Sequence, residues 1–172
     1  MKTMIVVGLA VVLMAVGGLF MVAEATPPAA AAVEMEITKN PALLVSPSMK
    51  AGEVTVHGVK LGDAIEKIPT NLVNTREDIP ERPQDIIYVG TDASYFAHAG
   101  KIYRIRIAGD LMKQVPTYDA GRLQVAMGKA DDIAQSPTGE EARLNFYARR
   151  VLYTVHAYRA LAVVVAVDLY AP

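Results

Sequence analysis

The feature that most constrains this chain is an unbroken apolar run near its start. Met4 to Val22 spans 19 residues without one charged side chain, and Lys2 precedes it. A helix in a soluble core normally keeps a polar face, which this run lacks. Its length fits a membrane span of about 17 to 25 residues, and its position fits the apolar core of a secretory signal peptide. Both interpretations predict export.

The residues after the run match a cleavage site. Ala23, Glu24 and Ala25 form the small-x-small pattern that signal peptidases accept, so residues 1–25 are predicted to be a signal peptide cleaved near Ala25 or a retained anchor. With Lys2 as the flanking positive charge, the positive-inside rule leaves the N-terminus in the cytoplasm and sends the remainder across. We therefore expect a periplasmic or extracytoplasmic domain, either soluble after cleavage or held by one N-terminal span.

The composition excludes several classes of function. Seventeen basic and eighteen acidic residues give a formal charge of -1, so the chain has no global field that would attract nucleic acid. The absence of cysteine excludes disulfides, thiolate metal sites, cysteine nucleophiles and a lipidated cysteine. A chain of 172 residues suits a leader and one domain of ordinary size.

Proline and alanine mark a spacer between the leader and the domain. Pro27 and Pro28 precede a run of alanines, and Pro41, Pro47 and Gly52 interrupt the weak alternation that follows. We therefore predict a linker over residues 26–52 and a folded domain over residues 53–172.

Two helix signals, each followed by strand signals, organise this domain. Asp63 follows a glycine and is predicted to cap a short helix that Pro69 ends, and Asp119 is predicted to cap a second helix that Gly128 ends. Alternating β-branched and aromatic residues predict strands at 86–89, 94–99, 101–107, 144–147, 151–158 and 160–170. The predicted fold class is α+β, with short helices packed on an antiparallel sheet.

A shift of 58 positions superimposes the two halves of this pattern. Tyr95 then falls on Tyr153, and His98 falls on His156. Because apolar alternation alone produces part of this agreement, either duplication or coincidence explains it. Duplication predicts tandem units at 53–109 and 110–172, each a helix followed by three strands.

The segment Gly58-Val59-Lys60-Leu61-Gly62-Asp63, placed before a short helix and three strands, resembles two groups of small exported domains. These are the outer-membrane-assembly lipoproteins of the SmpA/OmlA type and the β-lactamase-inhibitor-protein-like fold. The resemblance covers residues 53–170 and implies a helical segment before an antiparallel sheet, with two such units in tandem in the inhibitor protein. This chain departs from the pattern because it lacks the lipidated cysteine and has Tyr118-Asp119-Ala120-Gly121 in the second unit. No functional residue is therefore transferred.

Residues that carry chemistry are sparse. His57, His98 and His156 lack metal-ligand spacing, and the serines lack the motifs of nucleophiles. If the repeat is real, His98 and His156 are equivalent and form either a pH-sensitive pair or two separate strand histidines. The paired carboxylates Asp131-Asp132 and Glu140-Glu141 fit solvated loops better than a cation site. We predict no catalytic residue, cofactor or metal.

A cluster of arginines and tyrosines is the strongest candidate for a binding surface, because these residue types are favoured at interfaces. An ordinary polar strand face is the other interpretation. The members are Arg143, Tyr147, Arg149, Arg150, Tyr153, Tyr158 and Arg159.

The leading hypothesis is a non-enzymatic domain of the cell envelope that binds another envelope protein or a small ligand through its sheet. One alternative is an envelope enzyme whose site is assembled from dispersed Asp, Glu, His or Tyr residues. A second is a single-span subunit of a membrane complex, in which residues 4–22 pack against other spans.

Overall fold

The structure is a computed structural model that describes residues 35–116, 120–158 and 161–172. These residues fall within one compact unit, Ala32–Pro172. The apolar run at 4–22 and the predicted cleavage site lie outside the described residues. Within the described ranges, no helix is long and apolar enough to cross a bilayer.

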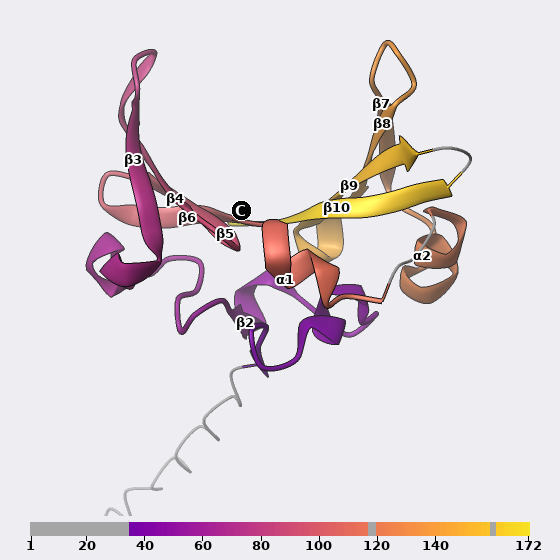
Figure 1. Cartoon of the computed structure of the whole chain (residues 1–172), viewed down its shortest axis with the longest axis horizontal. Helices are drawn as coiled ribbons and strands as arrows, with labels where there is room; N and C mark the ends of the chain where they lie inside the picture. Colours follow the sequence, from indigo (N-terminus) through magenta and orange to yellow (C-terminus); the bar gives the residue numbers. More distant parts are fainter. Residues whose placement is uncertain (1–34, 117–119, 159–160) are drawn as a thin grey trace, which may run out of the picture. The chain divides into compact units, whose positions relative to one another are not determined.

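An eight-stranded antiparallel sheet forms the centre of this unit (Figure 1). Its strands are β3 (Val73–Ile79), β4 (Arg82–Gly90), β5 (Ala93–His98), β6 (Lys101–Ile107), β7 (Asp132–Gln135), β8 (Glu141–Phe146), β9 (Val151–Tyr158) and β10 (Leu161–Tyr170). The strand order is β3-β4-β5-β6-β10-β9-β8-β7, so two four-stranded meanders meet at the β6–β10 pair.

The predicted α+β class with tandem helix-plus-three-strand units is wrong. The described chain is mostly β, with one continuous eight-stranded sheet, a separate two-stranded pair and two short α-helices, α1 (Gly109–Lys113) and α2 (Ala120–Met127). The helix expected after Asp63 is a single 3-10 turn, η3 (Ile65–Lys67). The Asp63 carboxylate caps nothing there, because it accepts a hydrogen bond from the Lys60 amide at 3.1 Å and pairs with Lys67 Nζ at 2.7 Å.

The two strands that the sequence pattern missed are the edges of the sheet. Strand β3 reads VNTREDI and is exposed over its five central residues, while all four residues of β7 are exposed. An edge strand with little covered surface needs no apolar alternation, and charged side chains there discourage pairing with another chain. Each half of the sheet therefore has four strands rather than three.

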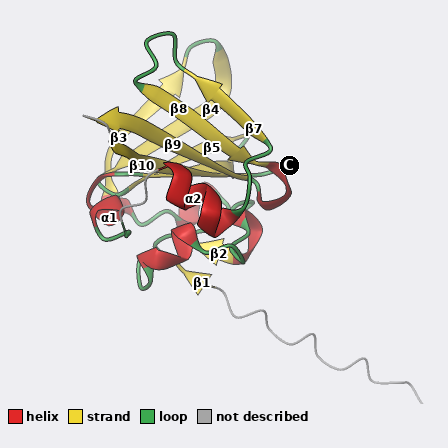
Figure 2. Ribbon diagram, turned by 90° about the vertical axis from the view of Figure 1, so that its right-hand side faces the viewer, coloured by secondary structure: helices red, strands yellow, loops and turns green. Residues whose placement is uncertain are grey.

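One face of the sheet is covered by the helices and by a layer from residues 35–72 (Figures 1 and 2). This layer contains the two-stranded parallel pair β1 (Met35–Glu36) and β2 (Val54–Thr55), and the turns η1 (Pro41–Val45), η2 (Ala51–Glu53) and η4 (Thr70–Leu72).

The core lies between this layer and the sheet. Ile37, Leu44 and Met49, all within the predicted linker, are fully buried there. Tyr95 on β5 donates a hydrogen bond to the Val56 carbonyl at 3.2 Å, and Tyr153 on β9 donates one to the Leu44 carbonyl at 2.7 Å. Residues 35–52 therefore belong to the folded body.

Candidate functional site

The face of the sheet opposite the core is left open by the helices and the N-terminal layer (Figure 1). Side chains alternate along a strand, so the neighbours of the buried core residues point to this face. The strand register then places Phe96 beside Arg104 and Arg106 beside Asp168. We call this surface the open face; its central residues are Phe96, Arg104, Arg106, Leu152, Thr154, Asp168 and Tyr170.

Asp168 organises the centre of the open face. Its Oδ1 accepts a hydrogen bond from Arg104 Nε at 2.9 Å, and its Oδ2 lies 3.9 Å from an Arg106 guanidinium nitrogen. The Arg104 guanidinium also lies over the Phe96 ring, 4.7 Å from its centroid, a favourable cation–π geometry. Asp168 is 1% exposed, while the two arginine side chains keep 32% and 37% of their surface exposed. Arg104 is thus held in place by Asp168 and Phe96, and both arginines remain accessible.

Two buried oxygens on the same face have unused hydrogen-bonding capacity. Asp168 Oδ2 and Thr154 Oγ1 have no hydrogen-bond partner among the described residues. The register places Asp168 opposite Leu152 on β9, and Thr154 opposite Ala166 on β10. An unsatisfied buried polar group costs about 1–3 kcal/mol. The floor of the open face therefore favours a water molecule or a partner group that supplies a hydrogen bond.

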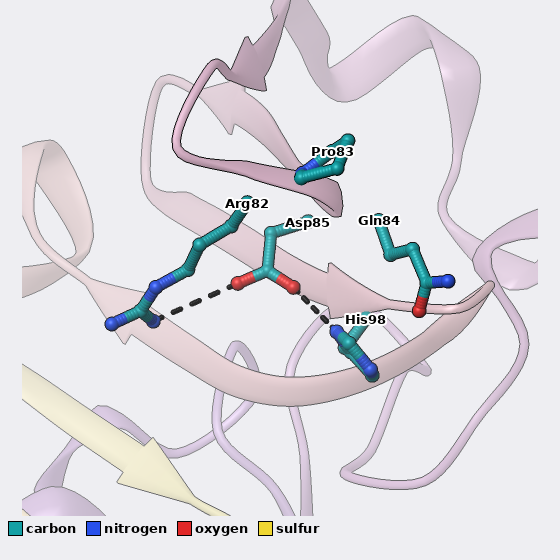
Figure 3. Close-up of a pocket in the computed structure, with 5 residues that line it drawn as sticks. All are labelled: Arg82, Pro83, Gln84, Asp85 and His98. Carbon is teal, nitrogen blue, oxygen red and sulfur yellow. Dashed lines mark hydrogen bonds and ion pairs between the residues drawn. The ribbon is translucent and has the colours of Figure 1, made fainter.

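A pocket of about 390 Å³ lies where β4 and β5 meet at one end of the sheet (Figure 3). His98 Nδ1 lies 2.5 Å from Asp85 Oδ1, and Arg82 lies 3.7 Å from Asp85 Oδ2. Tyr103 donates a hydrogen bond to Oδ2 at 3.4 Å. The hydrogen bond with His98 is the main cause of a lowered pKa at Asp85, which burial only partly opposes. Asp85 therefore stays ionised and orients the imidazole.

The other half of the sheet holds a second histidine–carboxylate pair. Glu141 on β8 accepts a hydrogen bond from Arg143 Nε at 2.9 Å and lies 3.3 Å from His156 Nε2. The hydrogen bond from Arg143, followed by the one with His156, lowers the pKa of Glu141. His98 and His156 do not meet, because β6 and β10 separate their strands. Each histidine has its own carboxylate instead.

The structure separates the predicted arginine and tyrosine cluster. Arg143 lies on the open face, while Tyr147, Arg149 and Arg150 lie in the turn η5 (Tyr147–Arg149) and directly after it. Tyr153 is fully buried and contributes no surface. The Tyr158 side chain and Arg159 lie outside the described parts of the chain.

Sequence reasoning missed the centre of the open face. Arg104 and Arg106 alternate with buried isoleucines, a pattern that predicts only a solvated strand face. The better signal was Asp168, a lone carboxylate in the otherwise apolar strand LAVVVAVDLY. A charge at such a position is rarely buried without a partner.

The predicted acidic pairs also have structural partners. Asp131 Oδ2 accepts a hydrogen bond from the Tyr147 amide at 2.8 Å, and Asp132 Oδ2 accepts one from the Tyr147 hydroxyl at 3.5 Å. Among the residues that the structure describes, no group of three or more His, Asp or Glu side chains is placed to hold a metal ion.

No family model, curated protein or solved structure matches the chain. The resemblance of residues 53–170 to the SmpA/OmlA-type and inhibitor-protein-like domains therefore stays a prediction.

Proposed function

We propose that this chain is an exported or membrane-tethered domain that binds a protein partner of the cell envelope through the open face and performs no catalysis. The observation that carries the proposal is the arginine–aromatic centre held by Asp168 on an uncovered sheet face. Arginine and aromatic side chains dominate binding energy at protein interfaces. Side chains fixed before binding lose less conformational entropy when the complex forms.

The charges at this centre indicate the chemistry of the partner. Arg104 and Arg106 together carry two positive charges, and Asp168 neutralises one of them. The aromatic ring of Phe96 and the aliphatic side chain of Leu152 lie on the same face. A partner surface with a carboxylate opposite Arg106, surrounded by apolar groups, complements this arrangement.

Site-specific photocrosslinking in intact cells tests the proposal. A photoreactive residue at Leu152, in the full chain, is expected to capture a protein, whereas one at Val125 is not. Val125 is 87% exposed on α2, away from the open face, so it controls for accessibility.

Charge reversal then tests whether the captured protein recognises the centre. Arg106→Glu is expected to reduce capture from Leu152 at least tenfold, while Lys39→Glu, an exposed position in the N-terminal layer, leaves it unchanged. Equal capture from Leu152 and Val125, or capture that Arg106→Glu does not affect, would contradict the proposal.

One observation favours an envelope enzyme as a second candidate. In the pocket of Figure 3, Asp85 holds the Nδ1 side of His98, and the other ring nitrogen faces away from the carboxylate. A carboxylate-oriented imidazole of this kind serves as a general base in many enzymes.

The enzyme hypothesis is tested by incubating the full chain with ester, phosphodiester and peptide substrates. An activity lost in both His98→Gln and Asp85→Asn, and kept in His156→Gln, would establish it. Failure of every substrate class, or an activity that survives His98→Gln, would remove the pocket from consideration.

A further inference from the structure

A separate cavity on another part of the molecule collects positive charge. It has a volume of about 310 Å³ and is lined by Lys50, Gly52, Glu53, Ala148, Arg149 and Arg150. These residues come from the N-terminal layer around η2 and from the β8–β9 connection at η5. Three cationic side chains and one carboxylate leave two net positive charges around the cavity.

The cationic side chains are held to different extents. The Arg149 guanidinium lies 5.7 Å from the centroid of the Phe146 ring, and one of its nitrogens lies 3.6 Å from the Met127 sulfur. Lys50 Nζ lies 3.3 Å from Glu53, but the two side chains are 63% and 50% exposed, so this ion pair is weak. Arg150 forms no ion pair with any side chain that the structure describes.

The backbone explains how two consecutive arginines reach one cavity. Adjacent residues of a strand point to opposite faces of the sheet. Here Arg150 ends the turn η5 in the left-handed conformation, with φ 57° and ψ 47°. Glycine adopts this conformation at much lower cost than arginine. The turn thus places an arginine, at a backbone cost, where it lines the same cavity as Arg149.

We propose that this cavity binds a phosphate ester. Guanidinium and ammonium groups are the protein donors best matched to phosphate oxygens, and the two net positive charges complement a phosphate monoester or diester. The volume lies at the lower end of the range for ligand pockets, about 300–1,000 Å³. The cavity therefore has room for an organic group attached to the phosphate. This site does not depend on the open face.

Two sources supply this chemistry, a phospholipid headgroup and a soluble phosphate ester. Glu53 directly precedes β2, Lys50 precedes the turn η2 that leads into β2, and β2 pairs with β1 at Met35, which follows the predicted leader in the chain. In a membrane-tethered protein this arrangement favours the headgroup. The choice between the two sources is made by experiment.

Isothermal titration calorimetry of the full chain in a neutral detergent tests the site. The titrants are glycerol 3-phosphate, dihexanoyl phosphatidylglycerol and, as a control anion, sulfate. We expect Arg150→Gly to weaken binding of the phosphate esters at least tenfold, and Lys50→Gln to weaken it several-fold. Because glycine suits the left-handed conformation, Arg150→Gly is expected to melt at or above the wild-type temperature, which excludes unfolding as the cause.

Ala99→Gly is the matched control. Ala99 has φ 47°, so glycine relieves the same backbone conformation there without changing a charge, and affinity should not change. Tighter binding of phosphatidylglycerol than of glycerol 3-phosphate supports the headgroup, while equal affinities support a soluble ester. Absence of binding by both esters, sulfate binding as tight as theirs, or undiminished binding by Arg150→Gly would overturn the proposal.

Discussion

Single carboxylates determine much of the local order, and Glu36 shows how. Its two oxygens accept hydrogen bonds from the amides of Thr38, His57 and Gly58 and from the hydroxyls of Thr38 and Thr55, at 2.6–3.1 Å. His57 and Gly58 both have positive φ, so the carboxylate also stabilises a turn that the backbone alone disfavours. Burial raises the pKa of Glu36, but these hydrogen bonds outweigh it, and the net pKa is lowered.

Stability should therefore depend on the ionisation of Glu36. A carboxylate with a lowered pKa in the folded state stabilises the fold above its unfolded pKa, and this contribution is lost as the pH falls through the folded pKa. We expect Glu36→Gln to lower the free energy of unfolding by about 2 kcal/mol at pH 7, because hydrogen bonds to a charged group are lost. Below about pH 4 the difference from wild type should shrink. Urea unfolding between pH 7 and pH 3, with exposed Glu66→Gln as control, measures this; parallel curves for the two variants would refute it.

At the scale of elements, the connections between strands depend on glycine at a few places. Gly109 begins α1 with φ 64°, and a Cβ there would overlap the Thr91 carbonyl oxygen. Gly100 has φ 79° in the β5–β6 turn, but nothing lies within 4 Å of a Cβ at that position. We expect Gly100→Ala to lower the free energy of unfolding by about 1 kcal/mol, from backbone conformation alone. Gly109→Ala should lower it by about 3 kcal/mol, because the chain must also move away from the new Cβ. Chemical denaturation measures the free energy of unfolding of both variants. Equal losses would show that the backbone at Thr91 moves away from the new Cβ at little cost.

The central position of β10 leads to a prediction for the C-terminus. It pairs with β6 on one side and β9 on the other, and it contributes buried Val167 and Leu169. A chain ending at Arg159 loses this strand and splits the sheet, so we expect no cooperative thermal unfolding. A chain ending at Ala171 removes only exposed Pro172 and should unfold like wild type. A soluble product ending at Arg159 that melts cooperatively would contradict this assignment of β10.

The elements also show where sequence pattern is informative. Strands β5, β6 and β9 match their predicted ranges closely, because β-branched and aromatic residues alternate where one face is buried. Strands β3 and β7 gave no such signal because little of their surface is covered. The prediction of a helix after Asp63 was wrong, because the Asp63 carboxylate has other partners and does not cap the turn.

At the scale of the whole molecule, the open face was beyond sequence reasoning. Arg104 and Asp168 are 64 positions apart and meet only because β6 pairs with β10. A change of register by one residue would put either side chain on the other face, and no pattern in a single sequence fixes that register. The symmetric strand order places Tyr95 and Tyr153 on the third strand of each meander, but common descent of the halves stays a prediction.

The apolar run at residues 4–22 predicts the compartment in which the molecule resides. Nineteen apolar residues after Lys2 favour translocation, whether or not cleavage follows at Ala25. A reporter enzyme that needs disulfides, fused after Pro172, is expected to be active, because disulfides form and persist only in an oxidising compartment. Val11→Arg combined with Val12→Arg should abolish this activity. Each arginine at the centre of the apolar run raises the free energy of inserting the run into the membrane by about 2.5–3.5 kcal/mol. An inactive fusion found in the cytosol with Met1 intact would refute export. It would also exclude the envelope partners proposed for the open face.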